Sequence, residues 1–346
     1  MKVFSRMLEG GYESLHLLSD ARTGLRGFVA LHSTVLGPGL GGTRALTTYA
    51  SEEEAAVDAL RLARGMTYKA AMAGLPLGGG KAVIWLPKGD FNRAALFEAF
   101  GRGVDGLGGR YVTTEDSGTS PDDMVAVSRA TKHVVGLPGR SGDPSPVTAY
   151  GVVRGIEATH RHLTGSDSLK GVRVNVLGVG HVGRALVDEL HQRGAKIFVA
   201  DARAHCAEEA AKTFGATVLS PEALVANEAD YYAPCALGGA INDETLPKLR
   251  VKAITGAANN QLLEPRHGEG LVQRGILYVP DYVINAGGLI NVAQELEGYD
   301  REKAMARAKL IHDTVLELLE RSKREGRRPE QVADEMVEER IANGRR

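Results

Sequence analysis

Two lysines in the first third of the chain stand in settings that could lower their pKa. Lys81 follows Gly78–Gly80 and precedes an apolar run, and Lys69 lies in the stretch 66–69. Glycines let a substrate or the backbone approach closely. A lysine that acts as a base near neutral pH needs its pKa lowered by roughly three units from about 10.4, through burial and a like charge. Although most single lysines are solvated, we expect Lys81 to be a base and Lys69 to bind a carboxylate.

A carboxylate and an amide occupy two further candidate positions, each after an expected strand. Asp116 follows the strand predicted at 110–114 and could relay protons, or it could equally cap the helix that begins near Ser120. Asn259 follows the apolar run 253–255, and ligand crevices in parallel sheets form outside the carboxyl ends of strands. Its amide could bond a substrate carboxylate, or the residue could simply form a turn. Both alternatives stay open at this point.

A third feature has the G-x-G-x-x-G spacing of a nucleotide-binding loop. An apolar run at 172–177 precedes it and a helical pattern at 184–193 follows, which is the context that phosphate binding requires. The first glycine makes the turn, the second lets the backbone approach a pyrophosphate, and the third packs the helix against the strand. The candidate cofactor residues in this loop are Gly178, Val179, Gly180, His181, Val182 and Gly183.

An acidic residue ends the strand after this loop. Asp201 would accept hydrogen bonds from ribose hydroxyls and repel a 2′-phosphate, which favours NAD over NADP. Arg203, two residues later, weakens that preference. The structural alternative is a tight turn followed by a solvated acid, and the agreement of glycine spacing, flanking elements and acid argues against it.

The elements expected around the lysines are short strands and helices. A strand at 25–35 is followed by a glycine-rich stretch, 37–42, which predicts a loop. A capping-box pattern at Ser51 begins a helix that we expect to end at Gly65. The other expected elements are strands at 81–85 and 110–114 and helices at 92–103 and 121–131. They predict an N-terminal α/β domain that carries Lys69, Lys81 and Asp116.

From residue 147 onward, short apolar runs alternate with helical patterns. The runs lie at 172–177, 196–200, 217–219, 230–233, 253–255 and 276–279. This alternation is typical of a doubly wound parallel sheet, the Rossmann architecture. The Gly-, Pro- and Ser-rich stretch 136–145 indicates a boundary. We therefore predict an α/β substrate domain over 1–140, a Rossmann domain over 141–325 with a cleft between them, and a C-terminal helical segment over 326–346.

Composition narrows the choice of partner to small molecules. A formal net charge of -1 favours neither nucleic acid nor an acidic surface. No apolar run approaches the roughly 20 residues that span a bilayer, and residues 1–20 lack the pattern of a leader, so we expect a cytoplasmic protein. The two cysteines, Cys206 and Cys235, form no disulfide framework or zinc pattern, and no histidine pair has ligand spacing, so no metal is predicted.

Six stretches, in order, resemble one known family. They are Leu40–Arg44, Arg61–Lys69, Gly78–Lys81, Pro144–Gly151, Gly256–Gln261 and Asp281–Gly288. Over most of its length the chain resembles the leucine, valine and phenylalanine dehydrogenases, within the wider glutamate dehydrogenase superfamily. The resemblance implies reversible NAD-dependent oxidative deamination of an L-amino acid to a 2-oxo acid, ammonia and NADH. It also implies a homo-oligomer in which segment 326–346 returns to the first domain.

The resemblance assigns roles to the candidate residues. It implies that Lys81 is the catalytic base and that Asp116 assists proton transfer. Lys69 with Asn259 would hold the substrate carboxylate, and backbone near Gly41 and Gly42 would line the site. Further contacts with NAD are implied for Ala202, Thr148, Cys235, Ala236 and Asn259.

The resemblance also indicates the substrate pocket. Leu40 stands where glutamate dehydrogenases carry a lysine for the side-chain carboxylate, so a second carboxylate would be buried unpaired and glutamate is disfavoured. Thr114, Leu289 and Val292 resemble the remaining pocket wall, and Thr114 and Leu289 replace the smaller Ala and Val usual in leucine dehydrogenases. One methylene changes discrimination by only about 1–3 kcal/mol, so leucine, valine and phenylalanine are not ranked.

Two other functions are weighed against this one. A 2-hydroxy-acid dehydrogenase shares the nucleotide fold but normally pairs a catalytic histidine with a carboxylate and binds substrate through arginine. A non-catalytic NAD-binding sensor would keep the fold without the chemistry. The joint presence of Lys69, Lys81, Asp116 and Asn259 argues against both.

Overall fold

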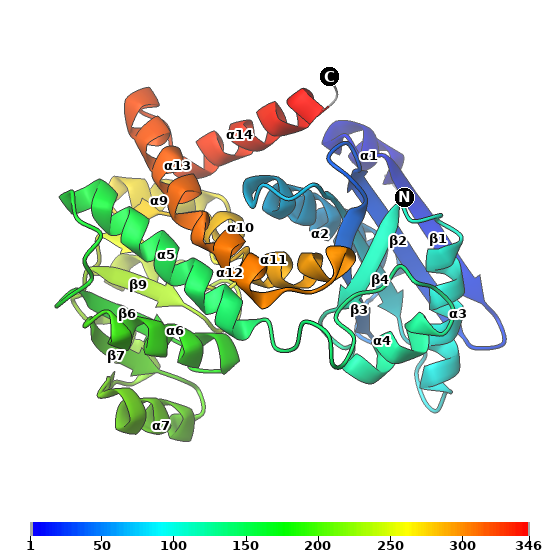
Figure 1. Cartoon of the computed structure of the whole chain (residues 1–346), viewed down its shortest axis with the longest axis horizontal. Coiled ribbons are helices and arrows are strands. Elements are labelled where there is room, and N and C mark those ends of the chain that lie inside the picture. The colour runs from blue at the N-terminus through cyan, green and yellow to red at the C-terminus, as the bar shows by residue number, and fades with distance from the viewer. Residues whose placement is uncertain (1–2, 345–346) are drawn as a thin grey trace. The chain divides into compact units, whose positions relative to one another are not determined.

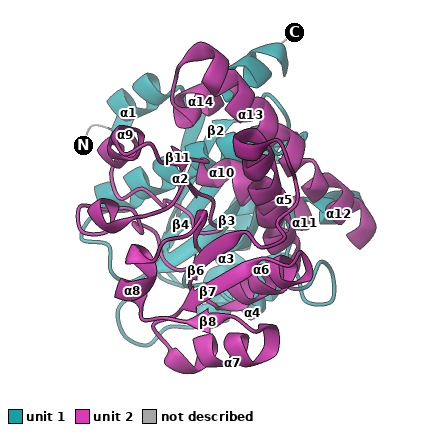
Figure 2. Cartoon of the chain, turned by 90° about the vertical axis from the view of Figure 1, so that its left-hand side faces the viewer, with its two compact units in different colours: residues 1–142, 292–300, 337–346 teal, residues 143–291, 301–336 magenta. Residues whose placement is uncertain are grey.

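The computed structural model describes residues 3–344 and divides into two compact units (Figures 1 and 2). Unit 1 contains residues 1–142, 292–300 and 337–346, and unit 2 contains residues 143–291 and 301–336. The chain first passes from unit 1 to unit 2 after Gly142, close to the boundary predicted at residue 140. The later crossings differ from the predicted division, because 292–300 groups with unit 1 and 326–336 with unit 2.

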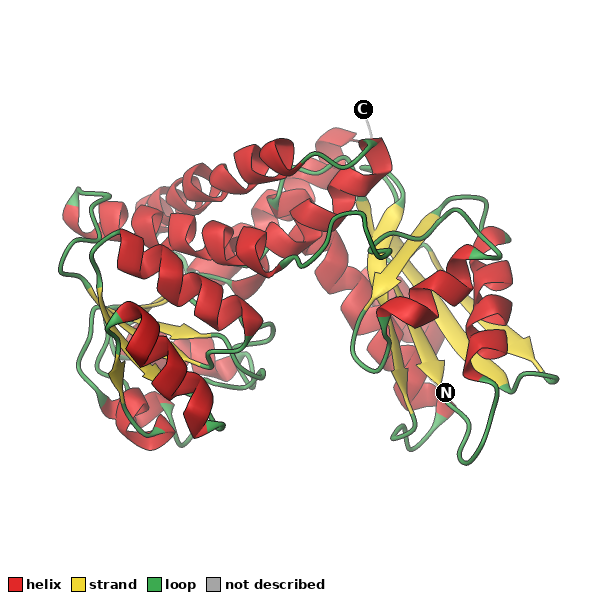
Figure 3. Ribbon diagram, turned by 60° about the horizontal axis from the view of Figure 1, so that its bottom comes forward, coloured by secondary structure: helices red, strands yellow, loops and turns green. Residues whose placement is uncertain are grey.

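Unit 1 is built on a mixed five-stranded sheet, with the order β1-β2-β4-β3-β5. The strands are β1 (Ser14–Asp20), β2 (Leu25–Ser33), β3 (Gly39–Leu46), β4 (Gly78–Trp85) and β5 (Tyr111–Glu115). β2 pairs antiparallel with β1 and β4, whereas β3 pairs parallel with β4 and β5. Helices flank this sheet (Figure 3). They are α1 (Val3–Gly10), α2 (Glu52–Met72), α3 (Arg93–Asp105) and α4 (Pro121–Ser128).

Alternation along the strands divides the core of unit 1 into two layers. Val29 and Leu31 of β2 belong to the core formed with α3 and α4, whereas Phe28 and Ala30 belong to the core formed with α2. On β4, Val83 lies in the α2 layer. Because side chains alternate along a strand, Lys81 shares the face of Val83 and lies on the α2 side of the sheet.

The structure corrects the predicted loop at 37–42 and the late start of the next strand. Residues 39–46 form β3, and β4 begins at Gly78 rather than at Lys81. The reason is close packing between backbones: a Cβ on Gly41 would lie 1.9 Å from the carbonyl oxygen of Gly80. The glycines that suggested a turn are therefore the residues that let these parallel strands approach.

Two helix ends also differ from the prediction. Helix α2 continues through the exposed Gly65 to Met72, so Lys69 lies in its last turn. Packing of buried residues such as Thr67 and Ala70 on unit 1 outweighs the roughly 1 kcal/mol penalty of one glycine. Helix α4 ends at Ser128, three residues before the expected end.

Unit 2 has the predicted doubly wound architecture. Its six strands are all parallel, in the order β11-β10-β9-β6-β7-β8. They are β6 (Arg173–Leu177), β7 (Lys196–Ala200), β8 (Thr217–Val218), β9 (Tyr231–Pro234), β10 (Ala253–Ile254) and β11 (Leu277–Tyr278). Each of the six predicted runs overlaps one of these strands, which confirms the Rossmann fold.

Helices connect and follow these strands. They are α5 (Ser145–Thr164), α6 (His181–Gln192), α7 (Ala204–Phe214), α8 (Pro221–Ala226), α9 (Arg266–Gln273), α10 (Asp281–Ile284), α11 (Gly287–Ala293), α12 (Arg301–Lys309), α13 (Ile311–Glu325) and α14 (Pro329–Gly344). Helix α13 ends at Glu325 with Gly326 as its C-cap, where a left-handed φ of 64° favours glycine, and α14 begins at Pro329. Among residues 3–344, no helix is long and apolar enough to cross a membrane.

Candidate functional site

Lys81 lies in the middle of unit 1, on a strand that packs unusually tightly. A Cβ on Gly79 would lie 2.0 Å from the backbone nitrogen of Thr67 on α2, and one on Gly80 would lie 2.6 Å from the Tyr111 ring. The glycines at 78–80 therefore let neighbouring parts of the protein pack closely against the strand. The sequence had left open whether they admit a substrate or the backbone. This packing leaves the Lys81 side chain only 8% exposed.

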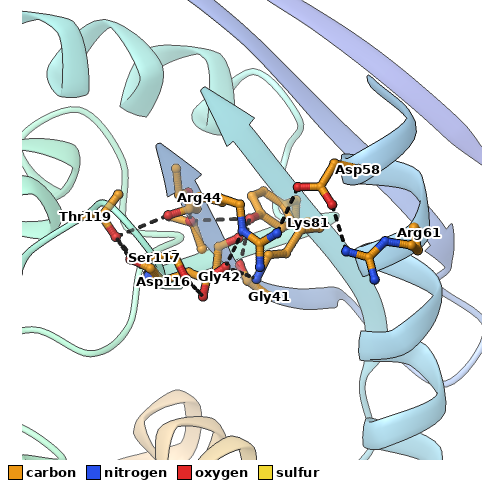
Figure 4. Close-up of polar contacts among 12 residues, drawn as sticks. Gly41, Gly42, Arg44, Asp58, Arg61, Lys81, Asp116, Ser117 and Thr119 are labelled. Carbon is orange, nitrogen blue, oxygen red and sulfur yellow. Dashed lines mark hydrogen bonds and ion pairs between the residues drawn. The ribbon is translucent and has the colours of Figure 1, made fainter. Parts of the chain in front are cut away.

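Asp116 is the direct partner of Lys81. Lys81 Nζ lies 2.5 Å from Asp116 Oδ2 (Figure 4). The backbone holds Asp116 in place just after β5, where its N–H donates to Thr119 Oγ1 at 2.8 Å. The alternative role as a helix cap is wrong, because Ser120 caps α4 in a capping box with Asp123. The two candidates, which the sequence suggested separately, thus form one ion pair.

The ion pair continues into a chain of alternating charges that the sequence analysis missed. Arg44 Nε lies 3.6 Å from Asp116 Oδ2, and Arg44 Nη1 lies 2.9 Å from Asp58 Oδ2. Asp58 also accepts from Arg61 at 2.9 Å and from the Tyr49 hydroxyl at 2.8 Å. The stretch Leu40–Arg44 contains this residue, but no strand was predicted there, so the sequence assigned Arg44 to no face of the sheet. As part of β3, it lies beside Lys81 on the α2 side (Figure 4).

These charges set the protonation of the pair. Burial lowers the pKa of Lys81 below its ordinary 10.5; Asp116 opposes that shift and Arg44 adds to it. Burial works against ionisation of Asp116, but Lys81, the Ser117 backbone N–H and Arg44 hold the pKa of Asp116 below its ordinary 3.8. An ionised carboxylate beside a lysine that releases its proton readily is an arrangement suited to proton transfer.

The other candidates in unit 1 occupy different positions. Lys69 is half-buried in the last turn of α2, and Gly41 and Gly42 are buried in β3. Leu40 is fully buried, between Gly79 and Val112 on the neighbouring strands.

Three further positions were predicted to form the pocket wall. Thr114, on β5, lies against Gly136, where an added Cβ would be 2.6 Å from the threonine Oγ1. Val292 is half-buried in unit 1, whereas Leu289 is buried in unit 2. The roles of all three in a substrate pocket stay predictions.

The nucleotide loop of unit 2 has the geometry that its glycines predict. Gly178 has a φ of 92°, in the left-handed region that glycine favours. A Cβ on Gly183 would lie 1.9 Å from the Gly178 carbonyl oxygen, so the third glycine packs helix against loop. Gly180 is the N-cap of α6 and faces open space, since an added Cβ would meet only Arg203 Nη2 at 3.8 Å.

Asp201 anchors this loop. Its Oδ2 accepts from the Val179 N–H and its Oδ1 from the Arg203 N–H, each at 2.8 Å. Burial opposes its charge, but these backbone bonds hold the pKa of Asp201 below its ordinary 3.8. The sequence analysis foresaw the acid at this point but not its two backbone donors.

A pocket adjoins the loop, with a volume of about 380 Å³. It is lined by Val179, Gly180, His181, Arg184, Arg203, Cys206 and Glu209. A glycine with open space around it at the start of a helix, an adjacent ionised carboxylate and a pocket beside them fit a dinucleotide. Val182 lies in the first turn of α6, and Ala202 directly follows Asp201.

Two of the other predicted cofactor residues lie against the loop. Ala236 is the nearest neighbour of a Cβ placed on Gly178, and Cys235 lies 3.3 Å from one placed on Gly183. Thr148 is on α5, where its hydroxyl donates to the Pro144 carbonyl at 2.9 Å. Contacts of these residues with NAD stay predictions.

Asn259 is exposed, and its Oδ1 accepts from Asn285 Nδ2 at 2.9 Å. Asn260, rather than Asn259, has the left-handed backbone conformation of a turn, with a φ of 50°. Within residues 3–344, no cluster of three His, Cys, Asp or Glu side chains could hold a metal ion.

Comparison with known proteins places both halves of the chain in one family. Residues 15–133 match the dimerisation domain of the Glu/Leu/Phe/Val dehydrogenases, and residues 199–326 match the glutamate/leucine/phenylalanine/valine dehydrogenase domain. Leucine dehydrogenase of Thermoactinomyces intermedius is 51% identical over 99% of this chain and 94% of its own length. Valine dehydrogenase of Streptomyces virginiae is 46% identical over 97% and 96%, respectively.

A solved structure agrees over the same span. The crystal structure of L-tryptophan dehydrogenase from Nostoc punctiforme superposes with a TM-score of 0.90 at 44% identity, covering 99% of both chains. The chain belongs to the Glu/Leu/Phe/Val dehydrogenase family.

Proposed function

We propose that this protein oxidatively deaminates an L-amino acid with an apolar side chain, using NAD, and that Lys81 is its catalytic base. The reaction class and the cofactor are those of the family, whose members include leucine, valine and tryptophan dehydrogenases. The buried Lys81–Asp116 ion pair, 2.5 Å long, is the observation that supports the assignment of the base. Substrate, NAD and water yield the 2-oxo acid, ammonium, NADH and a proton.

The chemistry needs a base in a position shielded from bulk water. NAD supplies the acceptor for the hydride that leaves Cα. Lys81, as a neutral amine, would take a proton from the water that attacks the resulting imine carbon, and as an ammonium it would return a proton to the departing amine. Asp116 would stabilise the ammonium form and pass protons onward. Burial of Lys81 supports this assignment because it makes the neutral amine accessible below pH 10.5.

The substrate carboxylate requires a cation that keeps its charge. Lys69 is the candidate in unit 1, where the last turn of α2 holds it half-buried. Asn259, in unit 2, stays a predicted second ligand, and Gly41 and Gly42 stay predicted lining. These assignments rest on the match of their motifs to the family.

The side-chain pocket is proposed to be apolar. Leu40 is fully buried and brings no charge to the position where glutamate dehydrogenases carry a lysine, so a second carboxylate would be desolvated without a partner. Thr114, Leu289 and Val292 are the other proposed wall residues. The expected substrates are therefore leucine, valine, phenylalanine or tryptophan rather than glutamate.

The cofactor half of the proposal rests on the loop 178–183 and Asp201. Asp201 is ionised and its side chain is only 9% exposed. A fixed negative charge beside the ribose position supports NAD over NADP. The proposed further contacts are Val179, His181, Val182, Ala202, Thr148, Cys235 and Ala236.

The test is a panel assay of NADH formation. Each L-amino acid is offered with NAD to the wild type, to Lys81→Ala and to the control Lys88→Ala, which replaces an exposed lysine. We expect turnover with apolar substrates, loss in Lys81→Ala and no loss in Lys88→Ala. Turnover of a 2-hydroxy acid instead would support the first rival, and NAD binding without any turnover would support the sensor.

We also propose a homo-oligomer in the cytoplasm. The matched domain at 15–133 is a dimerisation domain in its family, and unit 1 presents exposed Phe4, Leu8 and Leu17 with β1 as an edge strand. Edge strands and apolar patches favour association. Both cysteines are free thiols, which fits a reducing compartment. Light scattering of the wild type and of Leu17→Glu tests the association, since a wild-type monomer would contradict it.

A further inference from the structure

The buried pair creates a charge problem during turnover. When Lys81 becomes the neutral amine that a base must be, Asp116 loses the ammonium that stabilises its charge. An ionised carboxylate that loses its cation in a largely buried site is disfavoured. The site therefore needs a second cation that keeps its charge when Lys81 gives up its proton.

Arg44 is placed to be that cation. Its Nε lies 3.6 Å from the same Oδ2 of Asp116 that Lys81 contacts. Among the described residues, this buried Nε–H has no hydrogen-bond acceptor at present. Its other branch is anchored, because Nη1 donates to Asp58 at 2.9 Å. A small movement of the Asp116 carboxylate would complete the hydrogen bond to Arg44.

We propose that Arg44 is a positioning residue that serves as the alternate counterion of Asp116, taking over the carboxylate whenever Lys81 is neutral. The inference rests on the proposed role of Lys81 as the base. A guanidinium suits this task because it does not lose its proton in a protein. In the resting pair Asp116 lies with Lys81, and in the base form it lies with Arg44.

The surrounding charges support this assignment. On the α2 side, Asp58 holds Arg44 in place, and Arg61 and Tyr49 hold Asp58. On β5, burial raises the pKa of Glu115, and the nearby negative charges of Asp123 and Asp116 add to that rise. Tyr111, also on β5, keeps its proton because burial raises its pKa.

Arg44 also acts on Lys81 directly. Its positive charge adds to the lowering of the Lys81 pKa, whereas Asp116 and Asp58 raise it. Removing the guanidinium therefore has two effects of the same sign: Lys81 loses a repelling cation, and Asp116 is left with Lys81 as its remaining partner in the ion pair. Both effects favour the ammonium form and raise the pH at which Lys81 becomes a base.

The experiment is the pH dependence of kcat/KM for deamination, measured for the wild type, Arg44→Gln and Arg61→Gln. The substrate amino group titrates identically in all three, so a shift in the acid limb reports the enzyme. We expect the limb of Arg44→Gln to move upward by about one pH unit. Arg61→Gln is the matched control: it removes the other arginine that binds Asp58 at 2.9 Å without removing a partner of Asp116. Its limb should coincide with that of the wild type.

A second variant covers the case in which Arg44→Gln does not fold. Asp58→Asn is nearly isosteric and removes the carboxylate that pairs with Arg44 Nη1 at 2.9 Å. The limb of Asp58→Asn should move downward, because Arg44 then acts on the pair without its own counterion. A limb that does not move in Arg44→Gln, or that moves upward in Asp58→Asn, would overturn the inference. Absence of wild-type turnover would instead overturn the proposed function.

Discussion

The guanidinium of Arg340 donates hydrogen bonds to the carbonyl oxygens of Ala71 and Met72, at 2.6 and 3.1 Å. Arg340 belongs to the last turns of α14, and the two carbonyls lie at the C-terminal end of α2. A cation at this end of a helix complements its dipole and adds hydrogen bonds to its terminal carbonyls, of which that of Ala71 also accepts from the Gly74 N–H at 3.0 Å. A segment near the end of the chain thus stabilises the helical turn that carries Lys69.

The first prediction concerns this contact. Arg340→Ala should lower the free energy of unfolding by about 1.5 kcal/mol, the usual contribution of a hydrogen bond to a charged group. It should also raise KM for the amino acid several-fold while changing kcat little, since Lys69 is proposed to bind substrate. Thermal unfolding and steady-state kinetics check both effects. Arg340→Lys, which keeps the charge, should retain part of each, and an unchanged KM in Arg340→Ala would contradict the link to Lys69.

The second prediction contrasts two glycines, Gly79 and Gly65, that both stand next to the end of an expected element in the sequence. Gly79→Ala should destabilise the protein by about 3 kcal/mol or prevent folding, because its Cβ would lie 2.0 Å from the Thr67 nitrogen. Gly65→Ala should stabilise it by about 0.5–1 kcal/mol, because Gly65 lies within α2 with no neighbour within 4 Å of the added Cβ. Urea unfolding of both variants is the measurement. Equal effects on the unfolding midpoint would contradict the packing described for β4.

The third prediction is the pH response of Asp116→Asn. Asp116 raises the pKa of Lys81, so removing its charge should lower that pKa further and move the acid limb of kcat/KM to lower pH. The shift is opposite to the one expected for Arg44→Gln. Turnover at the plateau should fall by about 10²–10⁴-fold if Asp116 takes part in proton transfer. A pH profile of the variant measures both, and an upward shift would show that Lys81 is not the titrating base.

The Rossmann half was predictable from sequence because its signals are local. Parallel strands buried on both faces give short runs rich in apolar residues, such as the continuous 197–200 and the interrupted 172–177, and each is followed by a turn residue. Glycine acts as a helix terminator at Gly326, where the left-handed conformation requires it. In these places propensity and tertiary structure agree.

The strands of unit 1 were harder to predict because tertiary contacts, rather than local turn preferences, explain why glycine occupies these positions. Gly41 and Gly79 suggest turns by composition, but they lie in strands whose neighbours leave no room for a Cβ. The same misassignment hid the role of Arg44. By contrast, Lys81 and Asp116 were each singled out as candidates, because a lysine after three glycines and an acid after a strand remain informative when element boundaries are inexact.

The last prediction separates ligand binding from folding within one loop. In unit 2, Gly180→Ala adds a Cβ into open space, with Arg203 as its nearest neighbour at 3.8 Å, whereas Gly183→Ala drives a Cβ to 1.9 Å from the Gly178 carbonyl. Gly180→Ala should therefore keep the wild-type melting temperature and weaken NAD binding by at least about tenfold, a loss of 1.4 kcal/mol, because the Cβ would occupy the space proposed for the pyrophosphate. Gly183→Ala should lower the melting temperature with or without NAD. Calorimetric titration with NAD and thermal unfolding distinguish the two. If Gly180→Ala bound NAD as tightly as the wild type, the pyrophosphate would not lie at this helix N-terminus.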